Sequence, residues 1–242
     1  NRELEPTMLI DRPDSSRMLW VRYLVLGLLC LAPISAYLTR VMSAINKTLE
    51  VDFEIDEVAV GSILGVFNIG YVMCQVPGGW LAQRFSVRSV FPIMAVGWSL
   101  STIWFTTTDS EWGLNAARIV MGMFQAGMVP CCALVIGAWV KEHYRGLYSS
   151  LIGIAMQVGG VIATFLTPYL LKGSLSSSIS PMPWTEIYRW YAASGIIFAV
   201  AFVWIYRDRP SKHPWLKNEG ISQSDGANAA GVSPPAESLR VN

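Results

Sequence analysis

Charged side chains are scarce in this 242-residue sequence, and histidine is nearly absent. Charged residues make up 14% of the chain, there are two histidines, and 52% of the residues are hydrophobic. A soluble domain carries about 25% charged residues, because water must wet its surface. The composition therefore argues against a soluble domain, and the net charge of +1 gives no reason to expect a nucleic-acid partner.

Patterns typical of catalysis or metal binding are also missing. His143 and His213 fall in polar stretches. The four cysteines lie inside hydrophobic blocks, at spacings unlike those of metal sites: Cys30, Cys74, Cys131 and Cys132. A membrane-embedded enzyme would need a nucleophile with a base, or clustered acids or histidines, at membrane depth. We expect no catalytic residue, metal or cofactor, and interpret the cysteines as small apolar packing residues.

Long hydrophobic blocks fill most of the chain. A bilayer-crossing helix needs about 20 mainly apolar residues. Six blocks qualify, over residues 23–44, 58–81, 90–108, 113–138, 147–171 and 190–206. We predict an all-α integral membrane protein in which residues 23–206 form a six-helix transmembrane bundle. Residues 1–22 would be a cytoplasmic N-terminal segment, and residues 207–242 a cytoplasmic loop or tail whose composition predicts disorder.

Lysine and arginine predict the orientation of the spans, because cytoplasmic loops are enriched in both. With the N-terminus inside, thirteen of the 18 basic residues fall on the cytoplasmic side. Only Lys47, Lys172 and Arg189 fall in the outer links, and the first outer link also holds five acids. We therefore predict a plasma-membrane or inner-membrane protein with both termini in the cytoplasm.

Two arginines, but no acid, remain inside the hydrophobic blocks. At 1.5 Å per residue, Arg40 and Arg118 each lie about 9 Å below the predicted outer end of their helix. A charge at the bilayer centre is unfavourable by about 2.5–3.5 kcal/mol, so such residues are usually functional or neutralised. The expected partner is an anionic ligand, or an acid from another part of the protein, and the arginine fork fits a carboxylate or phosphate. The alternative is that both side chains snorkel to the outer interface.

Polar residues at helical spacing accompany these arginines. Tyr37 precedes Arg40 by about one turn, and Gln125 follows Arg118 by seven residues, on the same helix face. Asn68 and Gln157 are isolated polar residues in two other blocks, where helix–helix hydrogen bonding is the alternative role. The predicted substrate-binding residues are Arg40, Arg118, Tyr37, Gln125, Asn68 and Gln157.

The sequence GWLAQRFSVR after the second block resembles the signature loop of the major facilitator superfamily. Gly79, Arg84 and Arg88 match the family pattern, whereas Gln83 stands at the usual aspartate and Ser86 at the usual glycine. The resemblance implies a cytoplasmic latch loop whose arginines bind acids and helix C-termini of neighbouring helices. Anchoring by positive charge alone is the alternative.

Several other stretches are similar to the anion:cation symporter branch of that superfamily, which includes bacterial sugar-acid transporters, sialin and the vesicular glutamate transporters. They are residues 37–40, 67–79, 118–130, 139–146 and 207–215. The resemblance covers about residues 20–220. It implies the N-terminal half of a twelve-helix fold, completed by a missing C-terminal half or by a second copy. It also implies that Arg40 and Arg118 bind the anion.

Two positions depart from that branch, whose members commonly carry acids there for proton coupling. Here they hold Thr39 and Gln125, which take up no proton near neutral pH. We expect a secondary transporter for an organic anion, such as a carboxylate or sugar acid, with H⁺, Na⁺ or no coupling ion. The alternative is a non-transporting or half-size membrane protein that acts as a dimer or a regulatory partner.

Overall fold

The computed structural model describes residues 16–173, 180–209 and 213–216, and all regular structure in these ranges is helical. The α-helices are α1 (Ser16–Arg40), α2 (Asn46–Phe53), α3 (Glu57–Phe85), α4 (Val87–Phe105), α5 (Glu111–Gln125), α6 (Met128–Trp139), α7 (Arg145–Lys172) and α8 (Trp184–Ile205). Three short 3₁₀ turns are η1 (Ser43–Ile45), η2 (Glu142–Tyr144) and η4 (Pro214–Leu216). Most of the predicted N-terminal segment and of the predicted disordered tail lies outside the described residues.

Local sequence signals explain where several helices begin and end. Asp56 caps α3 by accepting a hydrogen bond from the Ala59 N–H at 2.8 Å, and Ser110 caps α5 by accepting one from the Gly113 N–H at 3.1 Å. At the end of α7, Gly173 adopts a φ of 65°, which glycine tolerates without steric strain.

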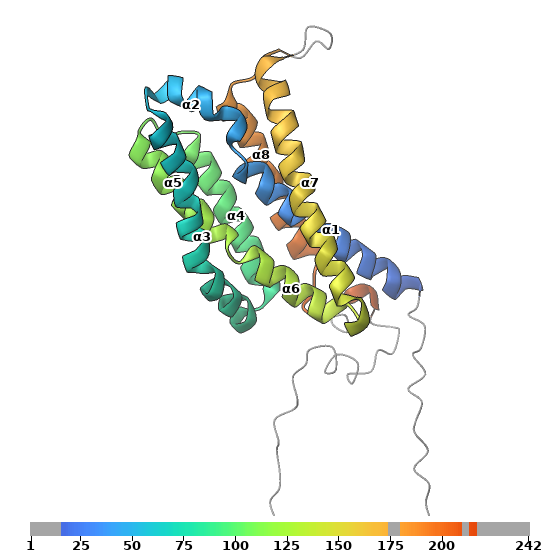
Figure 1. Cartoon of the computed structure of the whole chain (residues 1–242). Helices are drawn as coiled ribbons and strands as arrows, with labels where there is room; N and C mark the ends of the chain where they lie inside the picture. The colour runs from blue at the N-terminus through green and yellow to red at the C-terminus, as the bar shows by residue number, and fades with distance from the viewer. Residues whose placement is uncertain (1–15, 174–179, 210–212, 217–242) are drawn as a thin grey trace, which may run out of the picture.

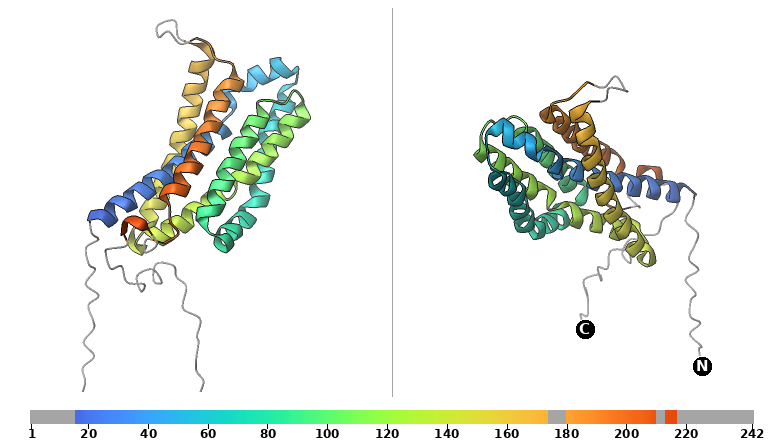
Figure 2. Two further views of the ribbon diagram at one scale, coloured as in Figure 1. Left: turned by 180° about the vertical axis from the view of Figure 1, so that it is seen from behind. Right: turned by 45° about the horizontal axis from the view of Figure 1, so that its top comes forward.

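The helices form one bundle, with α3, α4 and α5 on one side and α1, α7 and α8 on the other (Figure 1). The main packing pairs are α3 with α5, α4 with α5 and α8, and α1 with α7 and α8. The short helix α2 lies across one end of the bundle, and the start of α1 lies at the opposite end (Figures 1 and 2). The view from behind shows α8 running alongside α1 and α4 (Figure 2).

Five helical segments are long and apolar enough to cross a membrane. They are Ser16–Phe53, Glu57–Phe85, Glu111–Trp139, Glu142–Lys172 and Trp184–Ile205. The all-α fold is thus confirmed for the described residues, and five candidate spans are found where the sequence predicts six. Helix α4, which is 19 residues long, fills the remaining block, and it carries an arginine, three serines and a threonine among its apolar residues.

Two predicted spans are not single helices. The first was expected to continue to residue 44, but α1 ends at Arg40 and the chain turns through η1 into α2. The fourth is broken between α5 and α6 at Ala126 and Gly127. Pro130 explains the second break, because it has no N–H to donate to the carbonyl four residues earlier and its ring crowds that carbonyl. The break therefore falls directly after Gln125.

Candidate functional site

Helices α3 and α5 approach each other closely at two glycines, Gly70 and Gly122. This contact sets the positions of the site residues that the two helices carry. A Cβ on Gly70 would collide with the Ile119 carbonyl, and a Cβ on Gly122 would collide with the Phe67 carbonyl. Gly122 lies one turn after Arg118 on α5. The crossing therefore brings Arg118 and the aromatic residues of α3 together.

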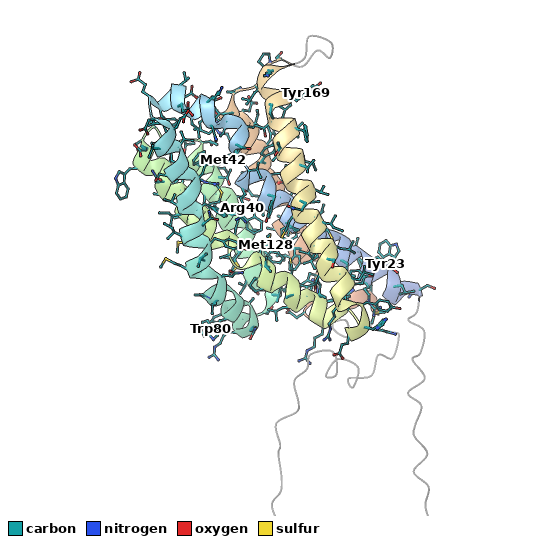
Figure 3. All side chains as sticks on the ribbon, in the orientation of Figure 1. Tyr23, Arg40, Met42, Trp80, Met128 and Tyr169 are labelled. Carbon is teal, nitrogen blue, oxygen red and sulfur yellow. The ribbon has the colours of Figure 1, made fainter. Side chains whose placement is uncertain are left out.

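Arg40 lies midway along the bundle, with Tyr169 towards one end and Trp80 towards the other (Figure 3). Three aromatic rings surround its guanidinium: the Cζ atom is 4.6 Å from the ring centroid of Phe67, 5.1 Å from Tyr71 and 5.3 Å from Tyr37. Its Nη2 also donates to Asn68 Oδ1 at 3.4 Å. The structure thus brings the predicted site residues Tyr37 and Asn68 to Arg40.

Arg118 is only 2% exposed and contacts only neutral acceptors. Its Nε donates to the Ile63 carbonyl, its Nη2 to the Arg40 carbonyl and its Nη1 to Met121 Sδ, each at 3.4 Å. The two bonds to carbonyl oxygens are long compared with the usual 2.9–3.0 Å of N–H···O bonds. Among the residues that the structure describes, no carboxylate pairs with Arg118 or Arg40. Arg118 therefore does not snorkel to the surface.

The two guanidiniums share one aromatic ring. The Cζ atoms of Arg40 and Arg118 lie 4.6 and 4.9 Å from the Phe67 centroid, so they are less than 10 Å apart. At an effective dielectric constant of about 20, two like charges at this separation repel by about 1.7 kcal/mol or more. An anion bound near both would relieve this repulsion, so the arrangement favours an anionic ligand.

The positions Thr39 and Gln125 form a neutral, hydrogen-bonded pair beside Arg40. Gln125 Nε2 donates to Thr39 Oγ1 at 3.1 Å and to the Ala36 carbonyl at 3.2 Å. Thr39 Oγ1 donates to the same carbonyl at 2.9 Å. Both side chains are essentially unexposed. The structure thus places Gln125 within reach of α1, but its amide is bound there to α1 and not to either arginine.

Gln157, the remaining predicted site residue, lies on α7. It is exposed on α7, in a shallow groove with Ser150, Gly153 and Ile154, and it hydrogen-bonds to neither Arg40 nor Arg118. Helix α7 still borders the site through Gly159, since a Cβ there would lie 3.0 Å from the Cβ of Tyr37.

The predicted latch loop connects the start of α4 to the end of α8 through two sets of hydrogen bonds. Arg88 donates through Nε and Nη2 to the Val203 carbonyl in the last turn of α8, at 3.3 and 3.1 Å. Asp208, just after α8, accepts from the Arg88 N–H at 3.2 Å and from Ser86 Oγ at 2.8 Å, and so caps the start of α4. Ser86 has a φ of 90°, which explains why a glycine is usual at this position.

The other two latch residues lie on α3. Gly79 packs against Pro130 of α6, where a Cβ added to the glycine would lie 3.1 Å from the proline Cβ, while the Arg84 side chain is exposed near the end of α3. Of the two arginines in the loop, it is thus Arg88 that bonds to a helix C-terminus in the described structure.

The segment after α8 folds back across the same end of the bundle. Trp139 Nε1 donates to the Arg207 carbonyl at 2.9 Å, and His213, only 2% exposed, shares a hydrogen bond with the Ile205 carbonyl at 3.0 Å. Burial lowers the pKa of His213, and the nearby positive charge of Arg207 lowers it further, against the opposing effect of the Ile205 carbonyl. Trp215 packs against Trp20 of α1, with ring centroids 6.2 Å apart.

These features define an all-α membrane bundle that holds two internal cations without carboxylate partners among the described residues. Residues 10–235 match the family described as Major Facilitator Superfamily, and the chain belongs to this superfamily. The expected resemblance is thereby confirmed.

The curated proteins and solved structures that are similar to this chain include two transporters and one transporter structure. "Probable anion transporter 5" of Arabidopsis thaliana is 30% identical over 80% of the chain and 44% of its own length. The D-galactonate transporter of Escherichia coli O6:H1 is 26% identical over 84% of the chain and 44% of its own length. Both are described as transporters, not enzymes. A bacterial homologue of the human lysosomal transporter Spinster, solved inward-facing and unoccupied, superposes with a TM-score of 0.63 at 18% identity, over 82% of this chain and 45% of that one.

The chain thus spans less than half the length of these curated relatives. The similarity to the Spinster homologue, at 18% identity, supports the fold alone.

Proposed function

We propose that the full protein is a secondary transporter that carries an organic anion, such as a carboxylate or sugar acid, by alternating access. The observation that carries this proposal is the pair of guanidiniums less than 10 Å apart with no carboxylate partner in the described residues. The names of the two relatives, an anion transporter and a D-galactonate transporter, support the same ligand class.

The two arginines take different roles in this proposal. Arg40 is partly exposed and has unused donors, so it meets the anion first. Tyr37 and Asn68 lie beside it and supply hydroxyl and amide groups for a polar substrate. Arg118 lies deeper and attracts the anion by its charge, and its long hydrogen bonds are weak enough to be exchanged when the site rearranges.

Proton coupling at the Thr39–Gln125 pair is not part of the proposal. Neither side chain titrates near neutral pH. Both are occupied in hydrogen bonds to each other and to Ala36. We infer that any coupling H⁺ or Na⁺ is bound by another part of the protein.

The exposed faces of the bundle support a half-transporter architecture. All four helices α3, α4, α7 and α8 expose large apolar residues, as expected for contact with lipid or with other transmembrane helices. The exposed faces of α3 and α7 additionally carry glycines and amides: Gly61, Gly65, Asn68, Gly153 and Gln157. Such residues suit helix–helix packing in a membrane. We propose that α3 and α7 face the remaining half of the transporter or a second copy.

The same proposal includes the topology. Helix α4 would be the sixth span, since its serine and threonine hydroxyls bond to backbone carbonyls three or four residues earlier, as Ser101 does to Gly97 at 2.8 Å. Both termini would be cytoplasmic, in a plasma or inner membrane, according to the distribution of lysine and arginine.

Uptake into proteoliposomes that contain the full-length protein tests the function. Radiolabelled D-galactonate and inorganic phosphate are the probes, and Arg40→Ala is compared with wild type. Arg189→Ala is the control, because Arg189 lies at the start of α8 and bonds to Thr106, away from the site. We expect the uptake rate of Arg40→Ala to be at least tenfold lower than that of wild type. A factor of ten corresponds to about 1.4 kcal/mol of lost interaction free energy. Equal uptake by Arg40→Ala and wild type would remove Arg40 from the site.

A further inference from the structure

We propose that Phe67 is a positioning residue of the anion site, whose ring orients the guanidiniums of both Arg40 and Arg118. This inference rests on the proposed anion site. It assigns to a buried apolar side chain a role in anion affinity that packing alone would not give it.

The geometry links Phe67 to both charges at once. The Cζ atoms of Arg40 and Arg118 lie 4.6 and 4.9 Å from its ring centroid. Cations within about 6 Å of an aromatic centroid are attracted by the negative face of the ring. No other aromatic ring among the described residues contacts both arginines, since Tyr37 and Tyr71 contact only Arg40.

A cation–π contact leaves the guanidinium able to bind an anion. The attraction acts on the charge above the ring, whereas a carboxylate binds the N–H groups at the edge of the guanidinium plane. Phe67 thus restrains the two side chains without using their donors. Restraint before binding reduces the conformational entropy that is lost when the anion binds.

The ring itself is held rigidly. Phe67 is 1% exposed, and Tyr71, one turn later on α3, stacks on it with centroids 5.9 Å apart and an interplanar angle of 25°. Its backbone is pressed against α5 at Gly122, where no side chain fits. The Phe67 ring is therefore held in one position, and the more flexible arginine side chains adopt conformations that place their guanidiniums against it.

The experiment changes the electrostatics of the ring without changing its packing much. In the full-length protein, Phe67 is replaced by phenylalanine carrying one, two or three ring fluorines, which weaken the negative face stepwise. Phe91 receives the same series as the control, because it is fully buried and its ring neighbours, including Phe198 and Phe202, are uncharged. Uptake of D-galactonate and of inorganic phosphate is measured for each variant.

We expect the KM of the transported probe to rise stepwise with fluorination at Phe67, by about three- to tenfold in total, given the strength of cation–π contacts. The maximal rate should stay within about twofold, and the Phe91 series should leave KM unchanged. Phe67→Leu should raise KM at least as much, and Phe67→Tyr, which keeps the ring, should restore most of the affinity.

Three outcomes overturn the proposal. If KM is flat across the Phe67 series while Arg40→Ala still abolishes uptake, the anion site stands and Phe67 is only a packing residue. If both the Phe67 and Phe91 series raise KM equally, the effect comes from packing and not from ring charge. If wild type takes up neither probe, or Arg40→Ala is unchanged, the proposed function itself fails and this inference fails with it.

Discussion

Arg118→Met separates a binding role of Arg118 from a structural one, because the two roles predict opposite effects on stability. The change removes a 2%-exposed charge but keeps a long, unbranched side chain. It relieves the repulsion from Arg40 of about 1.7 kcal/mol, and it also removes the several kcal/mol of desolvation that a buried ion carries. Against this, it loses one cation–π contact with Phe67, of about 0.5–2 kcal/mol, two long N–H···O hydrogen bonds and one N–H···S contact.

The balance predicts that Arg118→Met is at least as stable as wild type without ligand. Uptake should nevertheless fall by at least about a hundredfold, because a charged hydrogen bond contributes about 1.5–3 kcal/mol and a bidentate pair makes two. Two assays on the full-length protein check this: uptake in proteoliposomes, and thermal unfolding in detergent with and without D-galactonate. Ligand should raise the Tm of wild type but not that of Arg118→Met.

Arg145→Met is the matched control. Arg145 also donates to backbone carbonyls, those of Val140 and Gly137 at 3.3 and 3.2 Å, but it lies outside the site. This variant should lose stability and keep its ligand-induced shift in Tm. If Arg118→Met instead loses stability as Arg145→Met does and keeps its uptake, Arg118 only bonds neighbouring helices together and the reasoning is refuted.

Three further predictions concern single residues. Gln125→Glu should make uptake pH-dependent between about pH 5 and 8, because a protonated carboxyl can donate to the Ala36 carbonyl as the amide does and an ionised one cannot; a flat pH profile would contradict this. Ser86→Ala should lower stability by about 1–2 kcal/mol, since it keeps the positive φ and loses the bond to Asp208, whereas Ser86→Gly should be near neutral in thermal unfolding. The pKa of His213 is lowered, so the packing of residues 213–216 against the bundle should be fully stable above about pH 6.5 and weaken as the pH falls below that value. Hydrogen exchange at residues 213–216 measures this stability, and His213→Gln should remove its pH dependence.

The sequence was sufficient to predict the helical membrane architecture and the position of the internal charge. Long apolar blocks and isolated arginines are local properties, and the structure does bring Tyr37 and Asn68 to Arg40. The spans with breaks were harder to predict. The hydropathy of the sequence does not reflect that Pro130 lacks a backbone N–H. Residues 113–138 are therefore predicted as one span, where the structure has α5 and α6.

Other features depend on contacts between distant segments and have no local signal. Phe67 looks like an ordinary apolar residue in sequence, and only the crossing of α3 and α5 places it against both arginines. The i, i+4 spacing of Phe67 and Tyr71 on a helix with two nearby glycines was the one available hint. Likewise, the cap that Asp208 supplies to α4 joins residues about 120 positions apart in the chain.

Helix α3 is continuous from Phe67 to Phe85 and can therefore act as a lever between the arginines and the loop before α4. At 1.5 Å per residue this arm is about 27 Å long, so a tilt of about 10° pivoting at Phe67 would displace its far end by about 5 Å. Between these ends, Gly78 packs closely against Gly127 at the break between α5 and α6, with the Met94 side chain beside both glycines. Small adjustments around a bound anion would thus be amplified at the opposite end of the bundle.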